Sequence, residues 1–503
     1  MTDRSGTPLL RTDGYKFSMA QSGFPLRRET FYMSFRRGGW QLVPFDLERE
    51  VRALLEVQVD DEQRAYLAAS GYAMSGGMEA AIGAPDPAAA VGREGLQVRA
   101  VPAGTWVHER EPIVSVTHTS FAASWLEPLL LRLNFPIQLA TQIARHGAAL
   151  DPLMLHASCD EQAEIMRRVI RAVGRDREAL ERLIVVDEDG YREAVRQEVE
   201  SLVDATGDPT RIFEVGMRAA TCEQQHRVCL ETLRGAGVTA TSNVDLARAL
   251  EMKAVGTMGH EHVQRWGDDR AAFRAMRDMR PGTPSYLLDT FDTLSSGVPA
   301  ALEVVRERPH PCAIRYDSGD KFAQYLFAHG EFERAGITPV HILEDGLDVA
   351  MTRRFEQLRS FTGLAPDRQI YGYGGSLVSR CWRNPLTRDA VAAVYKLSST
   401  SGEPRMKFGN EAGLGKVSVP GDPVVWRRLR GRGPLSVIGQ AGERVPEDYV
   451  CLSGNPDALE ALRICNVDAE IARGGEVPYE LSVQTQALVS RLSRSHHHAR
   501  PQT

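Results

Sequence analysis

Short apolar strands alternate with amphipathic helices from Arg211 to about Ser376, and this rhythm is what most limits how the chain can fold. Such alternation predicts parallel strands joined by crossover helices. About seven such units favour a barrel, irregular or incomplete, and leave a doubly wound open sheet as the competing architecture. Strands are expected at Ile212–Val215, Val238–Thr241, Ala254–Thr257, Tyr286–Leu288, Ala313–Tyr316, Pro339–Leu343 and Gln369–Tyr371, and helices at Glu223–Arg234, Val244–Met252, Phe322–Phe332 and Leu347–Arg359.

Nearly every predicted strand ends in a residue suited to chemistry rather than to packing. The carboxyl ends of barrel strands converge on one face, where active sites lie. Each residue alone has a plainer interpretation, because Asp and Ser commonly cap helices. Arg and His in the same register favour the functional interpretation. The residues are Arg218, Ser242, His260, Asp289 with Asp292, Asp317 with Asp320, Asp345, and Gly374-Gly375-Ser376.

The sequence on either side of this repeat differs in character. We expect an α/β protein built on an irregular or incomplete parallel β/α barrel, with an N-terminal α+β domain and a small β-rich C-terminal region. The segment before the barrel is unusually charged, has helical spacing and carries no recognisable chemistry. The predicted boundaries are 1–145 for the N-terminal α+β domain, 146–210 for a charged, solvated helical insertion, 211–400 for the barrel catalytic domain, 401–490 for the β-rich region and 491–503 for a disordered tail.

Charge and cysteine usage exclude several classes of protein. The 503 residues carry a formal net charge of -6, which argues against a nucleic-acid-binding surface. No apolar run reaches the ~18 residues that span a bilayer, and residues 1–16 lack the apolar core of a signal peptide. The 7 cysteines are scattered without a Cys-x-x-Cys pair, which favours reduced thiols over a disulfide framework or structural zinc. We therefore expect a cytoplasmic protein without nucleic-acid or membrane partners.

The segment Ile314-Arg-Tyr-Asp-Ser-Gly-Asp320 places two carboxylates beside an arginine. A predicted strand delivers Arg315 and Asp317, Gly319 permits a tight turn, and Asp320 can cap the next helix. Mg²⁺ prefers oxygen ligands and keeps several waters, so two carboxylates suit a Mg²⁺-bound pyrophosphate and sugar hydroxyls. A capped β–α turn is the alternative interpretation.

A glycine-rich loop, Tyr371-Gly-Tyr-Gly-Gly-Ser-Leu377, lies between a predicted strand and a possible helix. Glycine lets backbone N–H groups approach a phosphate closely, and a helix N-terminus favours negative charge. An exposed anion gains only about 0.3–1 kcal/mol from a helix dipole, so side-chain donors such as Arg388 or Lys396 are needed as well. An ordinary turn is the alternative.

Two histidines follow the third predicted strand, in Gly256-Thr-Met-Gly-His-Glu-His-Val263. Their i,i+2 spacing does not put both on one helix face, which argues against a shared helical zinc site. A single catalytic or phosphoryl-accepting histidine fits the spacing better. A hydrogen-bonded interior histidine is the alternative.

These segments resemble the nicotinate phosphoribosyltransferase family and, more distantly, its nicotinamide-using relatives. The motifs run in family order over most of residues 12–420, which is not expected by chance. They are Thr12-Asp-Gly-Tyr-Lys16, Phe35-Arg-Arg37, Gly216-Met-Arg218, Thr241-Ser-Asn243, Gly256 to His260, Leu288-Asp-Thr-Phe-Asp292, Arg315 to Asp320 and Gly372 to Ser376, followed by Val394-Tyr-Lys-Leu397 and Pro404-Arg-Met-Lys407.

The resemblance implies a role for each candidate residue. His260 would be catalytic and transiently phosphorylated by ATP. Asp289 and Asp317 would act in catalysis with Arg315 and face the ribose and Mg²⁺ as metal ligands. Tyr15 would stack on the pyridine ring from the partner subunit of a homodimer. The other substrate-binding residues would be Asp13, Arg36 at a phosphate across the same interface, Arg218 and Ser242 around the base, Asp292, Asp320, Asp345 and Gly346 toward the ribose, and Gly374 and Gly375 at the 5′-phosphate.

The reaction implied by the resemblance joins nicotinate to 5-phosphoribosyl 1-pyrophosphate, with ATP as co-substrate, in NAD biosynthesis. Serine at position 242 favours the acid, since a hydroxyl can donate to its carboxylate, whereas the nicotinamide-using relatives carry aspartate there. A nicotinamide-using enzyme of the same fold and a catalytically silent nucleotide-binding barrel are the alternatives. Two residues depart from the family pattern: Val215 replaces a usual aromatic residue, and Gly259 a more common alanine.

Overall fold

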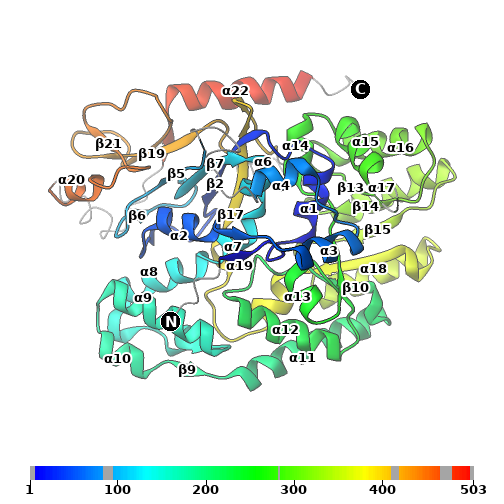
Figure 1. Cartoon of the computed structure of the whole chain (residues 1–503), viewed down its shortest axis with the longest axis horizontal. Coiled ribbons are helices and arrows are strands. Elements are labelled where there is room, and N and C mark those ends of the chain that lie inside the picture. Colours follow the sequence, from blue (N-terminus) through cyan, green and yellow to red (C-terminus); the bar gives the residue numbers. More distant parts are fainter. Residues whose placement is uncertain are drawn as a thin grey trace.

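The repeat forms one curled sheet of seven parallel strands, drawn in green to yellow in Figure 1. The computed structural model describes residues 6–82, 95–280, 282, 284–408, 418–464 and 479–498. Each predicted strand overlaps an observed one. The strands are β10 (Ile212–Glu214), β11 (Ala240–Thr241), β12 (Lys253–Ala254), β13 (Ser285–Leu287), β14 (Ala313–Tyr316), β15 (Val340–Leu343) and β16 (Gln369–Tyr373).

The strand order identifies this sheet as an incomplete barrel. The order is β12-β11-β10-β16-β15-β14-β13, so the first and last strands of the repeat, β10 and β16, pair with each other. That pairing curls the sheet round, which a doubly wound sheet would not do. The sheet stays open between its edges, β12 and β13, where the chain forms α14 (His260–Trp266) and α15 (Asp269–Met279). The fold class predicted from the sequence is confirmed.

Amphipathic helices cover the outside of the barrel because their apolar faces need the sheet. Leu230, Leu233 and Phe355 belong to the main core together with Tyr371 and Leu343 of the strands, and each fully buried apolar side chain contributes about 1.5–3 kcal/mol. The helices are α12 (Glu223–Gly235), α13 (Val244–Ala249), α16 (Val298–Glu307), α17 (Lys321–Arg334) and α18 (Val349–Phe361), with a π-helical turn at Thr293–Gly297 before α16 and another at Ser376–Arg380 after β16.

A second sheet lies beside the barrel and is assembled from distant parts of the chain. Its order is β18-β17-β2-β7-β5, and its pairings are antiparallel. The strand at 394–400 lies inside the predicted barrel segment, 211–400, yet it pairs with β2 rather than with the barrel. The sequence did not reveal this pairing, because it joins residues more than three hundred positions apart. The strands are β2 (Arg28–Ser34), β5 (Gln97–Ala100), β7 (Val114–Thr119), β17 (Val394–Thr400) and β18 (Glu403–Pro404).

Helices of the first 146 residues surround this second sheet. Phe17, Phe121 and Trp125 of the helices share one core with Phe31 and Tyr395 of the strands. The apolar stretch from Leu126 to Ile143 lies in two helices, α7 and α8. The bounds are α1 (Gly14–Gln21), α2 (Leu47–Leu54), α3 (Asp61–Ala69), α4 (Gly76–Ile82), α6 (Ser120–Trp125), α7 (Glu127–Leu131) and α8 (Asn134–His146), with α19 (Arg388–Val391) between barrel and sheet.

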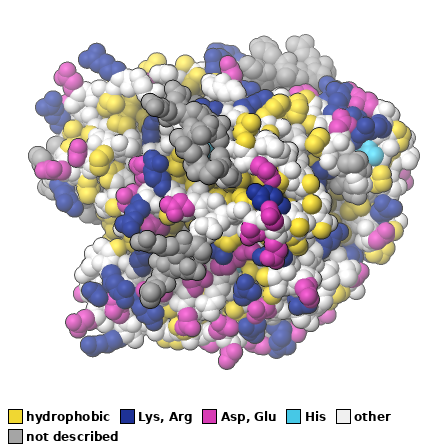
Figure 2. All heavy atoms as spheres, in the orientation of Figure 1, with side chains coloured by type: hydrophobic (Ala, Val, Ile, Leu, Met, Phe, Trp, Pro, Cys, Tyr) yellow, Lys and Arg dark blue, Asp and Glu magenta, His cyan; other side chains and the backbone are white. Residues whose placement is uncertain are grey.

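The charged segment between residues 146 and 210 is not a solvated insertion, as the sequence suggested. Tyr191, Val195, Val199 and Leu202 of its longest helix belong to the main barrel core. Only the outer face of the segment is charged. Its helices lie along the bottom of the view in Figure 1, and Figure 2 shows basic and acidic side chains interspersed there. The segment contains α9 (Asp160–Val173), α10 (Arg177–Arg182) and α11 (Glu188–Thr206).

A four-stranded sheet forms the C-terminal region, in the order β21-β19-β20-β22. The tail expected to be disordered from residue 491 continues as helix to His498, because this helix lies against β20 and β22; residues 499–503 lie outside the described part. The elements are β19 (Pro423–Arg428), β20 (Ser436–Gln440), β21 (Tyr449–Cys451), β22 (Glu480–Leu481), α20 (Ala458–Ile464) and α22 (Val483–His498).

Short pairings complete the fold. Among the helices that the structure describes, none combines the length and apolarity needed to cross a bilayer. The short strands are β1 (Thr7–Pro8) with β4 (Val57–Gln58), β3 (Gln41–Leu42) with β6 (Trp106–Val107), and β8 (His156–Ala157) with β9 (Val185–Val186).

Candidate active site

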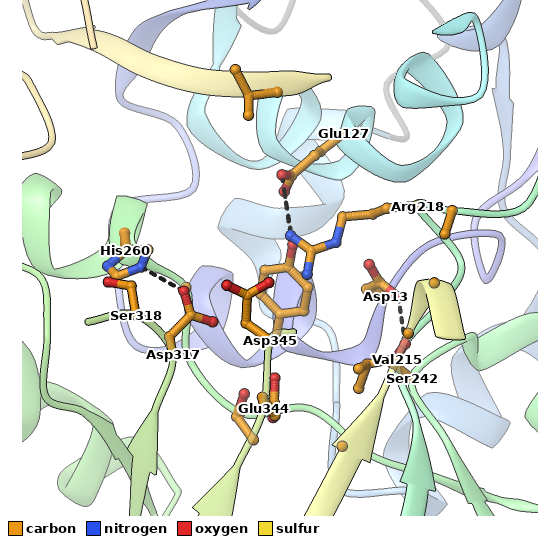
Figure 3. Close-up of a pocket in the computed structure, with 18 of the residues that line it drawn as sticks. Asp13, Glu127, Val215, Arg218, Ser242, His260, Asp317, Ser318, Glu344 and Asp345 are labelled. Carbon is orange, nitrogen blue, oxygen red and sulfur yellow. Dashed lines mark hydrogen bonds and ion pairs between the residues drawn. The ribbon is translucent and has the colours of Figure 1, made fainter. Parts of the chain in front are cut away.

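A pocket opens between the carboxyl ends of the barrel strands and the second sheet (Figure 3). One wall comes from the barrel, and the other comes from the start of the chain, from α7 and from β17. This is the face on which the sequence predicted an active site. Most of the predicted residues line the pocket: Asp13, Tyr15, Arg36, Arg218, Ser242, His260, Arg315, Asp317, Asp345, Gly346, Gly374 and Gly375.

The start of the chain reaches the pocket of its own barrel. Asp13 forms an antiparallel bridge with Asn243, and the Gly14 N–H donates to the Ser242 carbonyl at 2.7 Å. Only glycine permits this approach, since a Cβ on Gly256 would lie 2.3 Å from the Gly14 carbonyl carbon. Tyr15 and Arg36 thus line the pocket of their own chain, whereas the sequence suggested that a partner subunit supplies them.

A buried carboxylate, Glu127, organises the wall opposite the barrel. Lys16 Nζ lies 2.5 Å from Glu127 Oε2, and Arg218 Nη1 lies 3.6 Å from Oε1. The Tyr15 hydroxyl donates to Oε2 at 2.7 Å. Burial alone would raise the pKa of Glu127, but Lys16 and Arg218 hold it below its ordinary value. Glu127 is therefore ionised near neutral pH and holds Tyr15 and Arg218 toward the pocket.

His260, the first residue of α14, joins the two walls. Its Nδ1 lies 3.1 Å from Thr290 Oγ1, and its Nε2 lies 3.2 Å from Asp317 Oδ2 and 2.7 Å from Lys407 Nζ. An ammonium group can only donate, so Nε2 accepts and the ring proton is assigned to Nδ1. Burial, and then the nearby Lys407, lower the pKa of His260. The ring is therefore neutral, with a nucleophilic lone pair on Nε2.

The second histidine of the motif has a structural environment. His262 is fully buried, and its Nε2 lies 3.1 Å from the Ala272 carbonyl. Burial lowers the pKa of His262 to about 3, so it stays neutral. Of the two histidines, His260 alone lines the pocket.

Arg315 on β14 is nearly saturated by protein partners. Its Nη1 donates to Thr257 Oγ1 at 3.0 Å and to the Met258 carbonyl at 2.8 Å. Its Nη2 donates to Asp317 Oδ1 at 2.7 Å and lies 3.1 Å from Glu344 Oε2. A guanidinium carries five N–H groups, so these contacts use most of them. Arg315 ties the loop before His260 to two carboxylates and has little capacity left for a substrate.

Ser242, after β11, points at Asp13. Its Oγ donates to Asp13 Oδ1 at 2.6 Å (Figure 3). Asp13 Oδ2 is buried and has no hydrogen-bond partner among the described residues. Burial raises the pKa of Asp13. In this geometry the serine oxygen offers the pocket an acceptor, not the donor that the sequence suggested.

Basic side chains surround the glycine loop that follows β16. A Cβ on Gly375 would lie 2.6 Å from Asp389 Oδ2, so a side chain there would require the Asp389 side chain to move. Burial, and then the nearby Arg36, lower the pKa of Lys396 to about 7. This end of the pocket has the charge and the exposed backbone that a phosphate group needs. Its basic residues are Arg36, Arg380, Arg388, Lys396 and Lys407.

Two of the predicted substrate-binding carboxylates are helix caps outside the pocket lining. Asp292 accepts from the Ser295 N–H at 2.8 Å, and Asp320 accepts from the Phe322 N–H at 3.1 Å. The geometry therefore favours helix capping, rather than substrate binding, as the role of Asp292 and Asp320.

Asp289 lies behind His260 and completes a cluster that could hold a metal ion. Ligand atoms of His260, Asp289 and Asp317 all lie within 4.8 Å of one another. Asp289 Oδ1 is buried and without a hydrogen-bond partner among the described residues. Two carboxylates suit Mg²⁺, which prefers oxygen. Lys407 Nζ, 3.9 Å from Asp289 Oδ2, brings a positive charge to the same place.

Part of the chain is similar in sequence to known proteins. No family model matches the chain. A nicotinate phosphoribosyltransferase of Mycobacterium tuberculosis is 32% identical over 220 residues, which are 42% of this chain and 43% of that relative. One from Bacillus subtilis is 27% identical over 222 residues, 43% of this chain and 41% of that one. Over this part of its length the chain is similar to nicotinate phosphoribosyltransferases. It spans less than half the length of these curated relatives.

Solved structures of family members share the fold. The nicotinate phosphoribosyltransferase of Porphyromonas gingivalis superposes with a TM-score of 0.56 at 18% identity, covering 81% of this chain and 95% of that one. At this identity the likeness concerns the architecture alone. It agrees with the incomplete barrel described above.

Several pocket residues were not among the predicted site residues. Glu127 was visible only as a charge inside the apolar run that starts at Trp125. Glu344, whose Oε1 is buried without a hydrogen-bond partner among the described residues, looked like a turn residue beside Asp345. Lys407 lies 147 residues from His260 in the chain. The usable signals were a charge within an apolar run for Glu127 and the family-like motif for Lys407.

Proposed function

We propose that the chain is a nicotinate phosphoribosyltransferase of NAD biosynthesis, joining nicotinate to the ribose of 5-phosphoribosyl 1-pyrophosphate and releasing pyrophosphate. The observation that carries the proposal is one pocket that holds carboxylates of the barrel strand ends together with lysines from outside the barrel. Asp317 and Asp345 line it with Lys396 and Lys407. A ribose that becomes positive in the transition state suits the carboxylates, and phosphates suit the lysines. The named relatives of the family support this reaction.

Arg218 is the proposed partner of the nicotinate carboxylate. Its side chain is 26% exposed, and its nearest carboxylate contact, to Glu127, is 3.6 Å. It therefore keeps donors for a ligand, unlike Arg315. The guanidinium carbon lies 6.0 Å from the centre of the Tyr15 ring, so a pyridine stacked on Tyr15 would carry its carboxylate beside Arg218. Val215 would contact the other face of the ring in place of an aromatic side chain.

The chemical step needs no protein nucleophile. The pyridine nitrogen attacks C1 of the ribose, and the bond from C1 to pyrophosphate breaks as the new C–N bond forms. Asp317 and Asp345 stabilise the positive charge on the ribose, while Lys396 and Lys407 stabilise the leaving group. Mg²⁺, held by Asp289 and Asp317, would neutralise pyrophosphate charge when bound.

His260 is the proposed acceptor of a phosphoryl group from ATP. Its Nε2 bonds to the γ-phosphorus as the bond to ADP breaks, and Lys407 neutralises the charge that arrives. The phosphorylated ring would then change the affinity for substrates and products, each tenfold change being about 1.4 kcal/mol. His260→Ala should abolish stimulation by ATP and leave slow ATP-independent transfer. An acid-labile phosphate on His262 in the wild-type protein, found by mass spectrometry, would contradict this assignment.

One experiment tests the whole proposal. Pure protein is incubated with the phosphoribosyl donor, Mg²⁺ and either nicotinate or nicotinamide, with and without ATP, and the mononucleotide is identified by mass spectrometry. We expect nicotinate mononucleotide and pyrophosphate. The absence of pyrophosphate with either base would overturn the proposal in favour of a silent nucleotide-binding barrel.

Nicotinamide is the second candidate base, and the orientation of Ser242 favours it. Both the serine oxygen and Asp13 Oδ2 accept hydrogen bonds, and a carboxamide NH₂ can donate to both. The ratio of kcat/KM for the two bases decides between the candidates. The proposal also includes a cytoplasmic location and a homodimer in which each pocket belongs to one chain.

A further inference from the structure

Two cysteines meet on the outer side of the barrel, away from the pocket. Cys159 Sγ and Cys222 Sγ are 3.4 Å apart. Cys159 is the N-cap of α9, and Cys222 is the N-cap of α12. The two residues are 0% and 2% exposed. The N-termini of two long helices therefore converge on one pair of thiols.

The two helix starts are built alike. Each cysteine follows a hydroxyl residue and precedes a glutamine by three positions. The glutamine oxygen accepts both the backbone N–H and the hydroxyl of the residue before the cysteine. The distances are 2.7 and 2.8 Å from Ser158 to Gln162, and 2.7 and 2.9 Å from Thr221 to Gln225.

A reciprocal pair of hydrogen bonds fixes one helix start against the other. The Glu161 N–H donates to Gln224 Oε1 at 3.0 Å, and the Gln224 N–H donates to Glu161 Oε2 at 2.8 Å. Glu161 is exposed and Gln224 is half-buried, so this pair forms the outer edge of the junction. The arrangement holds the two helix starts, and with them the two sulfurs, in contact.

The two thiols are chemically unequal. A hydrogen bond from Cys222 lowers the pKa of Cys159, whereas burial raises that of Cys222. Helix N-termini also favour a thiolate, which is the nucleophilic form. Cys159 is therefore the attacking sulfur, and Cys222 supplies the second thiol.

We propose that Cys159 and Cys222 form a modification site, in which a hydroperoxide converts the two thiols into an intrachain disulfide. The Cys159 thiolate attacks the peroxide, so that an S–O bond forms, the O–O bond breaks and an alcohol or water leaves. Cys222 then attacks Cys159 sulfur, the S–S bond forms and water leaves. Two thiols are oxidised and one hydroperoxide is reduced.

The movement required is small. The sulfurs must approach by about 1.4 Å to reach the ~2.05 Å of a disulfide. The bond would tie α9 to the barrel helix α12 and close a long loop of the unfolded chain. Closing such a loop raises the free energy of unfolding. The oxidised protein should therefore unfold at a higher temperature than the reduced one.

Peptide mapping of the folded, full-length protein after treatment with hydrogen peroxide tests the site. Free thiols are blocked by alkylation, and the peptides are separated without reductant. We expect a linked pair containing Cys159 and Cys222, the loss of two alkylatable thiols, and a Tm several degrees higher, all reversed by dithiothreitol. Links among other cysteines only, or two thiols still alkylatable after treatment, would overturn the proposal.

Matched serine variants separate the disulfide from general oxidation. Cys159→Ser and Cys222→Ser keep a good N-cap and should lose the peroxide-dependent rise in Tm. Cys312→Ser alters another buried cysteine, and this variant should keep the peroxide-dependent rise in Tm. A rise that persists in Cys159→Ser would contradict the proposal. The assay measures a covalent link and a Tm, so its outcome is independent of the proposed transferase activity.

Discussion

The two walls of the pocket contribute different charged groups. The barrel wall contributes carboxylates at successive strand ends, Asp317, Glu344 and Asp345, while the opposite wall contributes two lysines, Lys396 and Lys407. The acids follow from the barrel itself, since strand ends and helix starts favour Asp. Lys396 lies on β17 of the second sheet, and Lys407 follows β18. The site therefore has this combination of charges only where both walls meet.

Replacing Asp317 with asparagine should have the largest effect, because it weakens the acidic wall at its centre. Burial opposes ionisation, but Arg315 holds the pKa of Asp317 well below its usual range. We expect kcat to fall about 100- to 1000-fold, as when one electrostatic contact to a transition state is removed. Asp320→Asn, at a helix cap outside the pocket, is the matched control. Equal losses in both variants would mean that Asp317 acts only through stability.

Mixing two inactive variants tests whether both walls belong to one chain. Tyr15→Ala damages one wall and Asp317→Ala the other. The two residues share a pocket within one chain, so co-incubation should restore no activity even if subunits exchange. The measurement is kcat after exchange has been verified with labelled subunits. Substantial recovery would show that α1 reaches a partner's barrel in solution.

Ser242→Asp should have an intermediate effect on base selection. The new carboxylate would lie beside Asp13, now 2.6 Å from the serine oxygen, and would repel a nicotinate carboxylate. We expect kcat/KM for nicotinate to fall by about tenfold or more, relative to nicotinamide. If Ser242 had only a structural role at the start of α13, the ratio of kcat/KM for nicotinate to that for nicotinamide would be the same in the variant as in the wild type.

The pH dependence of donor binding should show the smallest effect. The pKa of Lys396 is lowered to about 7, so its positive charge is present below this pH and is lost as the pH rises through it. We expect KM for the phosphoribosyl donor to rise several-fold between about pH 6 and 8. Lys396→Arg stays charged and should flatten this profile. An unchanged profile in the variant would assign the titration to another group.

How far the sequence predicted the molecule depended on the range of the contacts. The barrel strands were predicted to within a few residues, because each βα unit is local and repeats. The helical segment at 146–210 was misjudged: its outer face is charged, while Val195 and Leu202 lie in the barrel core. Periodicity revealed the helices there, but it did not show which partner covers their apolar side.

The sequence by itself determined the βα repeat, the family resemblance and the strand ends where the pocket lies, since all three depend on short local patterns. Only the tertiary structure decided which acids face the pocket, that Arg315 is engaged by Asp317 and Glu344, and that Lys407 reaches His260. These pairings depend on how the second sheet docks on the barrel. A local pattern carries no information about such contacts, because the partners lie far apart in the chain and meet only in the folded state.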